Sequence, residues 1–325
     1  MIAKERTIPI KVVKMEVLLK RIAQNHPKRH LIKEELLKRR AGHRGEQAID
    51  FYLSKLSPDD FYIFHNVRLS NGKYYFQMDT LILSAQTALI LEVKNFAGTI
   101  YFDPVLNQCI QTLPNGEKKG YLNPIEQVRQ QKNELLIWLN KRKITLPIET
   151  LVIISKPTTI INAENSKMLH NVIHSQYLTS KIQTIMRYCK NAVTTQKELK
   201  KLTRTILREH VDESFDILSY FKIASAEIIR GVYCVKCNQY TMRYFSGYWQ
   251  CLLCKQSEKQ AHKQAITDYF LLNNNLPISN KQFRDFFQIH SEHIAKYLLK
   301  SLNLPTTGTT KSKRYHSPTS PQQIK

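Results

Sequence analysis

Two predicted strands carry charged side chains within otherwise apolar sequence. Asp79 interrupts the run FQMDTLIL, and Glu92 and Lys94 lie two residues apart in LILEVKN, so both project from one face of a strand. Burying these groups among leucine, isoleucine and valine is costly unless they have partners. An isolated Glu-x-Lys pair on a strand is more often a solvent-facing ion pair, and Asp79 alone could cap a strand end.

Together, the three residues have the chemistry of a metal-dependent hydrolase. Two carboxylates on neighbouring strands make an oxygen-rich site that suits Mg²⁺ or Mn²⁺. Such an ion activates water and stabilises charge that develops on a phosphate. A lysine beside it can orient the water or neutralise the phosphate oxygens. The sequence therefore predicts Mg²⁺ or Mn²⁺ as a catalytic cofactor, with Asp79 and Glu92 as ligands and Lys94 beside them.

The segment that must position these residues alternates helices and strands. Asn71-Gly72 is a strong hairpin signal between two of its strands, and the short apolar run Leu151–Ile154 is typical of a buried strand. We expect an α/β sandwich around one sheet. The predicted helices are 42–56 and 124–141, and the predicted strands are 62–69, 75–84, 87–94 and 151–154, with an added hairpin of strands 98–102 and 108–113 around Asn115-Gly116.

Four separated motifs occur in this segment. They are GHRGEQ at 42–47, the strand-borne Asp79, EVKNFAG at 92–98 and NPIEQVRQQK at 123–132. In this order they resemble the nuclease-related domain (NERD) family of the PD-(D/E)XK superfamily, and the resemblance covers about residues 40–155. It implies a restriction-endonuclease-like α/β sandwich with a central mixed sheet.

The resemblance also assigns roles to five residues. Asp79 and Glu92 would be the metal ligands, Lys94 the catalytic lysine, Glu46 an additional acid of the core, and Gln127 a helix residue that contacts the phosphate or the water. From the residues alone, Glu46 could instead be stabilised near a helix N-terminus by the helix dipole. Gln127 could likewise be ordinary helix surface.

Two histidines and two cysteines are expected to be structural. His43 and His65 lie near the motifs, but hydrogen-bonded polar residues are a better interpretation than catalytic acids, because the metal site already supplies the chemistry. Cys109 and Cys189 stand alone in the sequence. Both are expected to be buried, unreactive small hydrophobes.

The other four cysteines form two Cys-x-x-Cys pairs separated by thirteen residues. This spacing is a strong signal for a zinc ribbon with one tetrahedral Zn²⁺. Four thiolates leave no open position, so the zinc would be structural; a disulfide pair or a redox role fits less well. The expected ligands are Cys234, Cys237, Cys251 and Cys254.

The chain has 49 Lys and Arg against 26 Asp and Glu, a net charge of +23 over 325 residues. Such a charge attracts polyanions, and nucleic acid is the commonest such partner. Anionic lipid or a merely basic surface is the alternative. No apolar run reaches the roughly 18 residues of a membrane-spanning helix, and the N-terminus lacks a signal-peptide pattern. We therefore expect a cytoplasmic protein that has no membrane partner.

The C-terminal sequence predicts three short helices within 258–304, with Ser279 or Asn280 as one N-cap. Their spacing resembles a helix-turn-helix, and TGTTKSKRYH could form a wing. The alternative is a helical bundle packed on the ribbon. Sequence beyond Tyr315 is expected to be mobile. In the DNA-docking interpretation, Ser291 and His293 face the groove, and the nucleic-acid-binding residues are Lys296, Lys311, Lys313 and Arg314.

The leading hypothesis is a metal-dependent nuclease that acts on nucleic acid, with DNA favoured. A non-catalytic DNA-binding protein that uses a nuclease-like fold for docking is the alternative, and an interaction protein with an acidic partner is a third. If two subunits pair so that both strands of DNA are cut, the protein would be a homodimer. The expected segments are a basic helical extension (1–41), a nuclease-like domain (42–156), a mixed connector (157–228), a zinc ribbon (229–257) and a helix-turn-helix-like domain with a mobile basic tail (258–325).

Overall fold

The structure is a computed structural model that describes residues 1–164, 169–189 and 191–318, without the side chain of Lys311. The chain forms two compact units. Unit 1 comprises residues 1–9 and 38–213, and unit 2 comprises residues 10–37 and 214–325. The division of the chain into five segments is not tested by these two units and stays a prediction. No helix among the described residues is long and apolar enough to cross a membrane.

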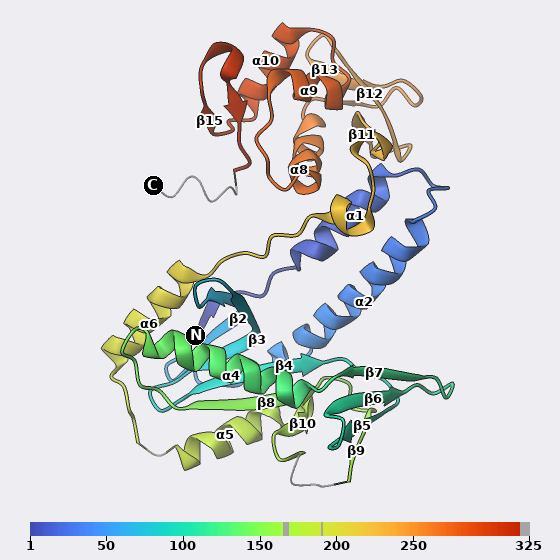
Figure 1. The fold of residues 1–325 in the computed structure, drawn as a ribbon. Helices are drawn as coiled ribbons and strands as arrows, with labels where there is room; N and C mark the ends of the chain where they lie inside the picture. The colour runs from blue at the N-terminus through green and yellow to red at the C-terminus, as the bar shows by residue number, and fades with distance from the viewer. Residues whose placement is uncertain (165–168, 190, 319–325) are drawn as a thin grey trace. The chain divides into compact units, whose positions relative to one another are not determined.

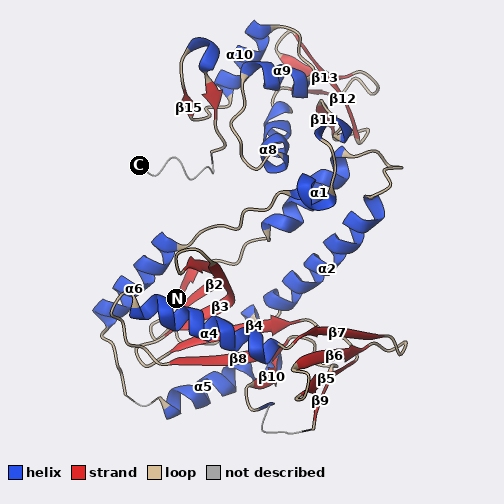
Figure 2. Cartoon of the chain, viewed as in Figure 1, coloured by secondary structure: helices blue, strands red, loops and turns tan. Residues whose placement is uncertain are grey.

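Unit 1 is built on a six-stranded mixed sheet (Figures 1 and 2). Its central strands β2, β3 and β4 are antiparallel neighbours, whereas β8 and β10 continue parallel to β4, and β1 lies parallel to β2 at the edge. The predicted mixed sheet is thereby confirmed. In sheet order the strands are β1 (Ile2–Lys4), β2 (Tyr62–Ser70), β3 (Tyr75–Leu83), β4 (Ala88–Lys94), β8 (Ile148–Ile154) and β10 (Val172–His174).

Side chains that alternate along the strands supply two cores, one on each face of this sheet. Ile90 of β4 packs in the core that includes α4 (Pro124–Asn140) and α6 (Gln196–Glu209). Its neighbours Leu89 and Leu91 pack in the opposite core, which includes α3 (Asp50–Leu53) and α5 (Leu178–Tyr188). The result is the expected α/β sandwich.

A smaller four-stranded sheet in unit 1 differs from the expected hairpin. Asn115-Gly116 turns the chain from β6 into β7, a strand that the sequence analysis missed, and β9 extends the other edge of the sheet. Cys109 is fully buried on β6, and burial raises the pKa of its thiol to about 11, whereas Cys189 is only half-buried. In order the strands are β7 (Lys118–Leu122), β6 (Gln108–Thr112), β5 (Thr99–Asp103) and β9 (Ile160–Ala163).

The helix expected over residues 42–56 is wrong in its boundaries. Helix α2 begins at Arg29 and ends at Gln47, so Gly42 and Gly45 lie near its C-terminal end rather than at the beginning of a helix. The separate short helix α3 follows. Glycine lowers helix propensity by about 1 kcal/mol but does not stop a helix that tertiary contacts hold.

Unit 2 combines α1 (Ile10–Arg21) with a four-stranded ribbon and three helices around a single core. Ser279 and Ser291 both cap helices, as their sequence context suggests. The remaining elements are α7 (Ile217–Phe221), β11 (Val232–Cys234), β12 (Gln239–Phe245), β13 (Tyr248–Cys251), β14 (Ser257–Glu258), α8 (His262–Leu272), α9 (Asn280–Phe287), α10 (Glu292–Ser301), β15 (Thr306–Thr307) and β16 (Arg314–Tyr315).

The chain does not become mobile directly after Tyr315, which corrects that expectation. Tyr315 pairs with Ile278 through two backbone hydrogen bonds. His316 donates its amide to the Pro305 carbonyl, contacts the Thr307 hydroxyl through its ring, and is buried together with Ser317. The β15–β16 hairpin is therefore packed against the rest of unit 2.

A buried histidine in unit 2 makes its stability depend on acid. Trp249 donates its indole N–H to His262 Nδ1 at 3.1 Å, and Nε2 lies 3.3 Å from the Ser301 hydroxyl. A protonated His262 ring would carry a hydrogen on Nδ1, and this hydrogen would face the Trp249 indole N–H, so that two donors would oppose each other. Burial and the nearby charge of Lys263 lower the pKa of His262 to about 4.

Because this folded pKa lies below the ordinary value near 6.5, the unfolded chain takes up the proton first as the pH falls. The stabilisation from neutral His262 is present above pH 6.5 and is lost toward pH 4, by up to roughly 3 kcal/mol. Trp138 is first replaced with phenylalanine, so that Trp249 is the one remaining tryptophan and its fluorescence reports on unit 2. In urea unfolding of this protein, the free energy of unfolding should depend less on pH after His262→Gln than before it. Parallel pH profiles for the two would contradict this assignment.

Candidate active site and four-cysteine cluster

Strand β4 and helix α4 bring together three of the predicted site residues. Glu92 is 2% exposed, and its Oε1 accepts a hydrogen bond from Lys94 Nζ at 2.7 Å. The same Nζ donates to Gln127 Oε1 at 2.8 Å. One helical turn further along α4, Gln131 Nε2 donates to Glu92 Oε2 at 2.8 Å. Both Glu92 and Lys94 face α4, as their period of two requires.

Asp79 lies on the neighbouring strand β3. Its Oδ2 accepts the backbone N–H of Val93 at 3.0 Å, which connects it directly to β4 between Glu92 and Lys94. Burial, together with the negative charges of Glu92 and Glu46, raises the pKa of Asp79 well above its usual range. The three carboxylates are therefore close enough to repel one another.

Glu46 reaches this site from α2, and Gly45 permits the approach. A Cβ on Gly45 would lie 2.6 Å from Asn95 Cβ, so only glycine lets α2 pass so close to the end of β4. Glu46 lies near the C-terminal end of α2, where the helix dipole disfavours a carboxylate. The N-terminal alternative for Glu46 is therefore wrong. Burial and Glu92 raise the pKa of Glu46, although Arg6 opposes the shift.

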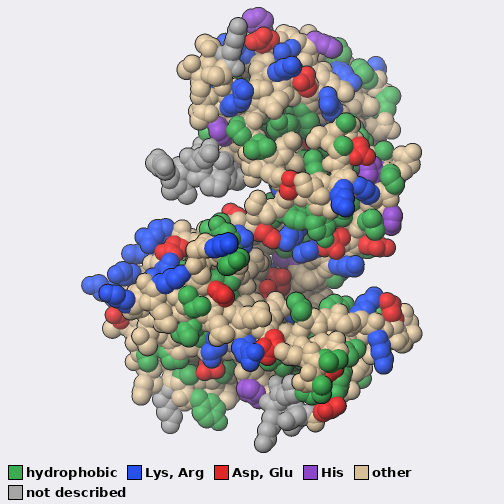
Figure 3. Space-filling model, in the orientation of Figure 1, with side chains coloured by type: hydrophobic (Ala, Val, Ile, Leu, Met, Phe, Trp, Pro, Cys, Tyr) green, Lys and Arg blue, Asp and Glu red, His purple; other side chains and the backbone are tan. Residues whose placement is uncertain are grey.

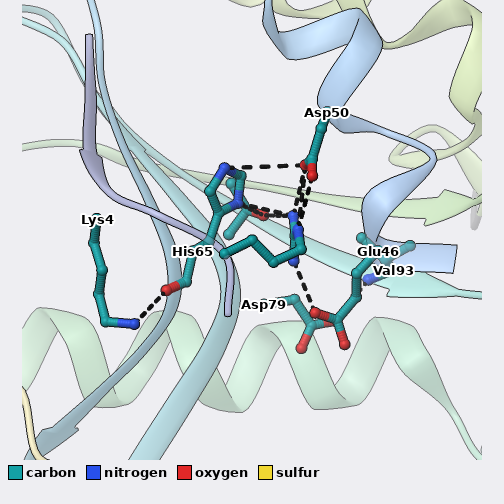
Figure 4. Close-up of polar contacts among 8 residues, drawn as sticks. Lys4, Glu46, Asp50, His65, Asp79 and Val93 are labelled. Carbon is teal, nitrogen blue, oxygen red and sulfur yellow. Dashed lines mark hydrogen bonds and ion pairs between the residues drawn. The ribbon is translucent and has the colours of Figure 1, made fainter. Parts of the chain in front are cut away.

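Arg6 supplies a cation to Glu46 and Asp50, two of the acidic residues labelled in Figure 4. The Arg6 guanidinium is 5% exposed and forms an ion pair of 2.7 Å with Glu46 and one of 2.9 Å with Asp50. It also donates to His65 Nδ1 at 2.8 Å and to Thr80 Oγ1 at 3.2 Å. One side chain thus links α2, α3, β2 and β3.

The two histidines of the motif region have different surroundings. His65 accepts from Arg6 at Nδ1, so the proton of its neutral ring lies on Nε2, 4.0 Å from Asp50. Burial and the charge of Arg6 lower the pKa of His65 to about 4. His65 is the hydrogen-bonded polar residue that was expected. His43 differs, because its Nδ1 is buried without a hydrogen-bond partner among the described residues.

Asp50, which pairs with Arg6, and three other residues of this site were missed in the sequence. Gln131 follows Gln127 by four residues, so a helical reading of NPIEQVRQQK could have found it. Asn66 hydrogen-bonds Glu46 from a left-handed backbone conformation (φ 51°) that asparagine tolerates. Arg6 had no local signal, because it lies 40 residues before its partner Glu46.

Replacing Arg6 with methionine is expected to lower the free energy of unfolding by about 3 kcal/mol, because two partly buried carboxylates lose their shared cation. Urea unfolding of the variant measures this change. Arg44→Met is the matched control, since Arg44 is exposed on α2, the helix that carries Glu46. This change should alter the free energy of unfolding by under about 0.5 kcal/mol. Equal losses in the two variants would show that the Arg6 contacts do not stabilise the fold.

The charge balance of the site fits a bound cation. Among the described residues, the group of four carboxylates of Glu46, Asp50, Asp79 and Glu92 forms ion pairs with two Lys or Arg side chains, Arg6 and Lys94. The buried side-chain oxygen Oε1 of Gln131 also has no partner among the described residues. Oxygen ligands of this kind suit Mg²⁺ or Mn²⁺. The carboxylates are less tightly gathered than the four cysteines of unit 2, whose Sγ atoms all lie within 4.8 Å of one another.

The four cysteines of unit 2 converge as their spacing predicts. The Sγ atoms of Cys237 lie 3.2 Å from Cys251 and 3.5 Å from Cys254, and those of Cys234 and Cys254 are 3.6 Å apart. A tetrahedral zinc with bonds of about 2.3 Å separates sulfurs by about 3.8 Å, so this cluster fits Zn²⁺. Burial raises the pKa of Cys251, but hydrogen bonds from the Cys254 amide and the Thr241 hydroxyl together outweigh it and lower the pKa to about 5.

A short hairpin of β15 and β16 lies in the segment that was expected to form a wing, and α10 precedes it in unit 2. Lys296 on α10, Lys313 just before β16 and Arg314 in β16 are exposed, and the side chain of Lys311 lies outside the described residues. Ser291 is not free to read a groove, since its hydroxyl accepts the Ile294 amide and caps α10.

Comparison with known proteins supports the resemblance. Residues 41–155 match the family model of the nuclease-related domain. The chain is also 23% identical over 172 residues to an uncharacterized protein of Bacillus anthracis, covering 52% of this chain and 77% of that relative. No solved structure matches the chain. Glu46, Asp79, Glu92, Lys94 and Gln127 all lie within the matched segment, whereas Arg6 lies before it.

Proposed function

We propose that this chain, whose residues 41–155 form a nuclease-related domain, is a metal-dependent nuclease that hydrolyses phosphodiester bonds. The observation that carries the proposal is the buried Glu92, which Lys94 and Gln131 hold beside Asp79 at the end of β4. A buried carboxylate with a neighbouring acid and a lysine is costly to keep. Two acids and a lysine are also the groups that metal-dependent hydrolysis of a phosphodiester uses.

In this proposal Asp79 and Glu92 hold Mg²⁺ or Mn²⁺, which when bound would activate water and stabilise phosphate charge. The Lys94 side chain, which lies between Glu92 and Gln127, offsets the negative charge that grows on the phosphate oxygens. Gln127 fixes the direction of the Lys94 ammonium through their 2.8 Å contact. Glu46 adds negative charge beside Asp79, and the ion pair with Arg6 offsets the cost of burying that charge.

Unit 2 has a supporting role in the proposal. The four-cysteine cluster binds structural Zn²⁺ and holds the ribbon on which the three C-terminal helices pack. Lys296, Lys313 and Arg314 present positive charge to nucleic acid. DNA is the favoured substrate, because a helix with a following hairpin resembles winged DNA-binding modules. The net charge of +23 supports a polyanionic partner.

A cleavage assay tests the proposal. The protein is incubated with single- and double-stranded DNA and RNA, each with Mg²⁺, with Mn²⁺ and with EDTA. Cleavage of at least one substrate that requires a divalent ion is the expected result, and the most rapidly cut substrate identifies the class. Tight, salt-sensitive binding without cleavage under every condition would contradict the nuclease and favour the non-catalytic DNA-binding alternative.

A further inference from the structure

Helix α6 of unit 1 concentrates positive charge on one face. Five cations occur in its 14 residues, and all five are exposed. At 100° per residue they fall within an arc of about 100°, directly opposite the buried face of Leu199, Leu202 and Ile206. The five cations are Lys197, Lys200, Lys201, Arg204 and Arg208, called here the α6 row.

The acidic side chains of α6 are occupied elsewhere and do not neutralise this row. Glu198 accepts the amide and hydroxyl of Thr195 in the N-terminal capping box. Glu209 binds Arg142, which follows the end of α4. Among the described residues, only Arg208 of the α6 row has an acidic side chain within 4 Å, and that contact with Glu209 is 3.8 Å long. Figure 3 shows the Lys and Arg side chains gathered over α6 at the left edge of unit 1.

We propose that the α6 row binds the sugar-phosphate backbone of a nucleic-acid duplex that extends beyond the candidate active site. The row spans twelve residues from Lys197 to Arg208, or about 16 Å along the helix axis, which matches several successive phosphates. Its apolar face is part of the unit 1 core, so α6 cannot insert that face into a membrane.

The position of α6 sets how far the partner must reach. Gln131, in the middle of α4, contacts Glu92, and Arg142, just after the C-terminal end of α4, contacts Glu209 of α6. From Gln131 to Asn140 the helix is about 14 Å long, a length along α4 that corresponds to about four base steps of a nucleic-acid strand. This inference rests on the proposed nuclease function and adds that the substrate is a duplex rather than a short oligonucleotide.

Charge reversal on the row tests the inference in the full-length protein. The variant Lys201→Glu/Arg204→Glu is compared with Lys118→Glu/Lys119→Glu, an equal charge change at exposed positions on β7 of the same unit. Affinity for a labelled 24-base-pair duplex is measured by fluorescence anisotropy in EDTA at several salt concentrations. Because no cleavage occurs in EDTA, this measurement stands even if the parent proves not to be a nuclease.

The α6 variant should bind the duplex at least tenfold more weakly than the β7 variant, and its log-log salt slope should be shallower by about 2, since two phosphate contacts are lost. With Mn²⁺ present, its KM for cleavage should rise in parallel. Equal affinities for the two variants would overturn the inference. So would unchanged duplex binding together with lost binding to vesicles of one part phosphatidylserine and three parts phosphatidylcholine, because the row would then recognise lipid headgroups.

Discussion

Replacing Lys94 with alanine is expected to reduce the cleavage rate by about 10²–10³-fold while leaving affinity for DNA nearly unchanged. The Lys94 ammonium lies within 2.8 Å of both Glu92 and Gln127, deep in the candidate site rather than on an open surface. Its loss removes the cation that faces the reacting phosphate. In the proposed nuclease, affinity for DNA comes mainly from the other cations of this strongly basic protein, which has a net charge of +23.

Single-turnover cleavage and binding in EDTA are measured on the same preparations. Lys118→Ala is the control, because it removes an equal charge from an exposed position on β7, and it should cleave at the parental rate. Parental cleavage by the Lys94 variant would remove the lysine from the catalytic assignment. Loss of DNA affinity in step with cleavage would instead show that Lys94 serves binding.

Removal of zinc is expected to unfold the ribbon of unit 2. Cys251 is fully buried in the core cluster that also contains Trp249 and Met242. Four unliganded thiols would leave this part of the core without its central crosslink. Structural zinc contributes roughly 10 kcal/mol or more of binding free energy to domains of this kind. We therefore expect Cys251→Ser to lose zinc and to lower the unfolding midpoint sharply.

The measurement combines zinc content per chain with thermal unfolding followed by circular dichroism. Cys189→Ser is the control, since Cys189 is a half-buried cysteine away from the cluster, and this variant should retain one zinc and the parental midpoint. A parent protein that contains no zinc, or a Cys251 variant as stable as the parent, would contradict the structural role of the metal.

Local sequence patterns predicted much of the candidate site. The period of two in LILEVKN placed Glu92 and Lys94 on one face, and the Asn71-Gly72 hairpin aligned β3 beside β2. The four cysteines were recognisable because metal geometry restricts their spacing. In each case the residues that interact are close in sequence or belong to one repeating pattern.

Contacts between distant segments could not be predicted in this way. The glycines of GHRGEQ predict the beginning of a helix, but Gly45 lies inside α2, where its missing side chain permits the close approach to Asn95. Arg6 belongs to the segment predicted as a basic helical extension (1–41), yet its side chain is almost fully buried and contacts four elements of unit 1. Such a role depends on the tertiary fold, and the composition of residues 1–9 gives no sign of it.

The most direct test of the central claim is a comparison of the parent with Glu92→Gln, which keeps the size of the side chain and removes its charge. Both proteins are given the best substrate of the parent, with Mn²⁺ and then with EDTA. The account predicts divalent-dependent cleavage by the parent, at least 100-fold less by the variant, and similar substrate binding by the two in EDTA. Cleavage at the same rate by both proteins, or cleavage by the parent that persists in EDTA, would contradict it.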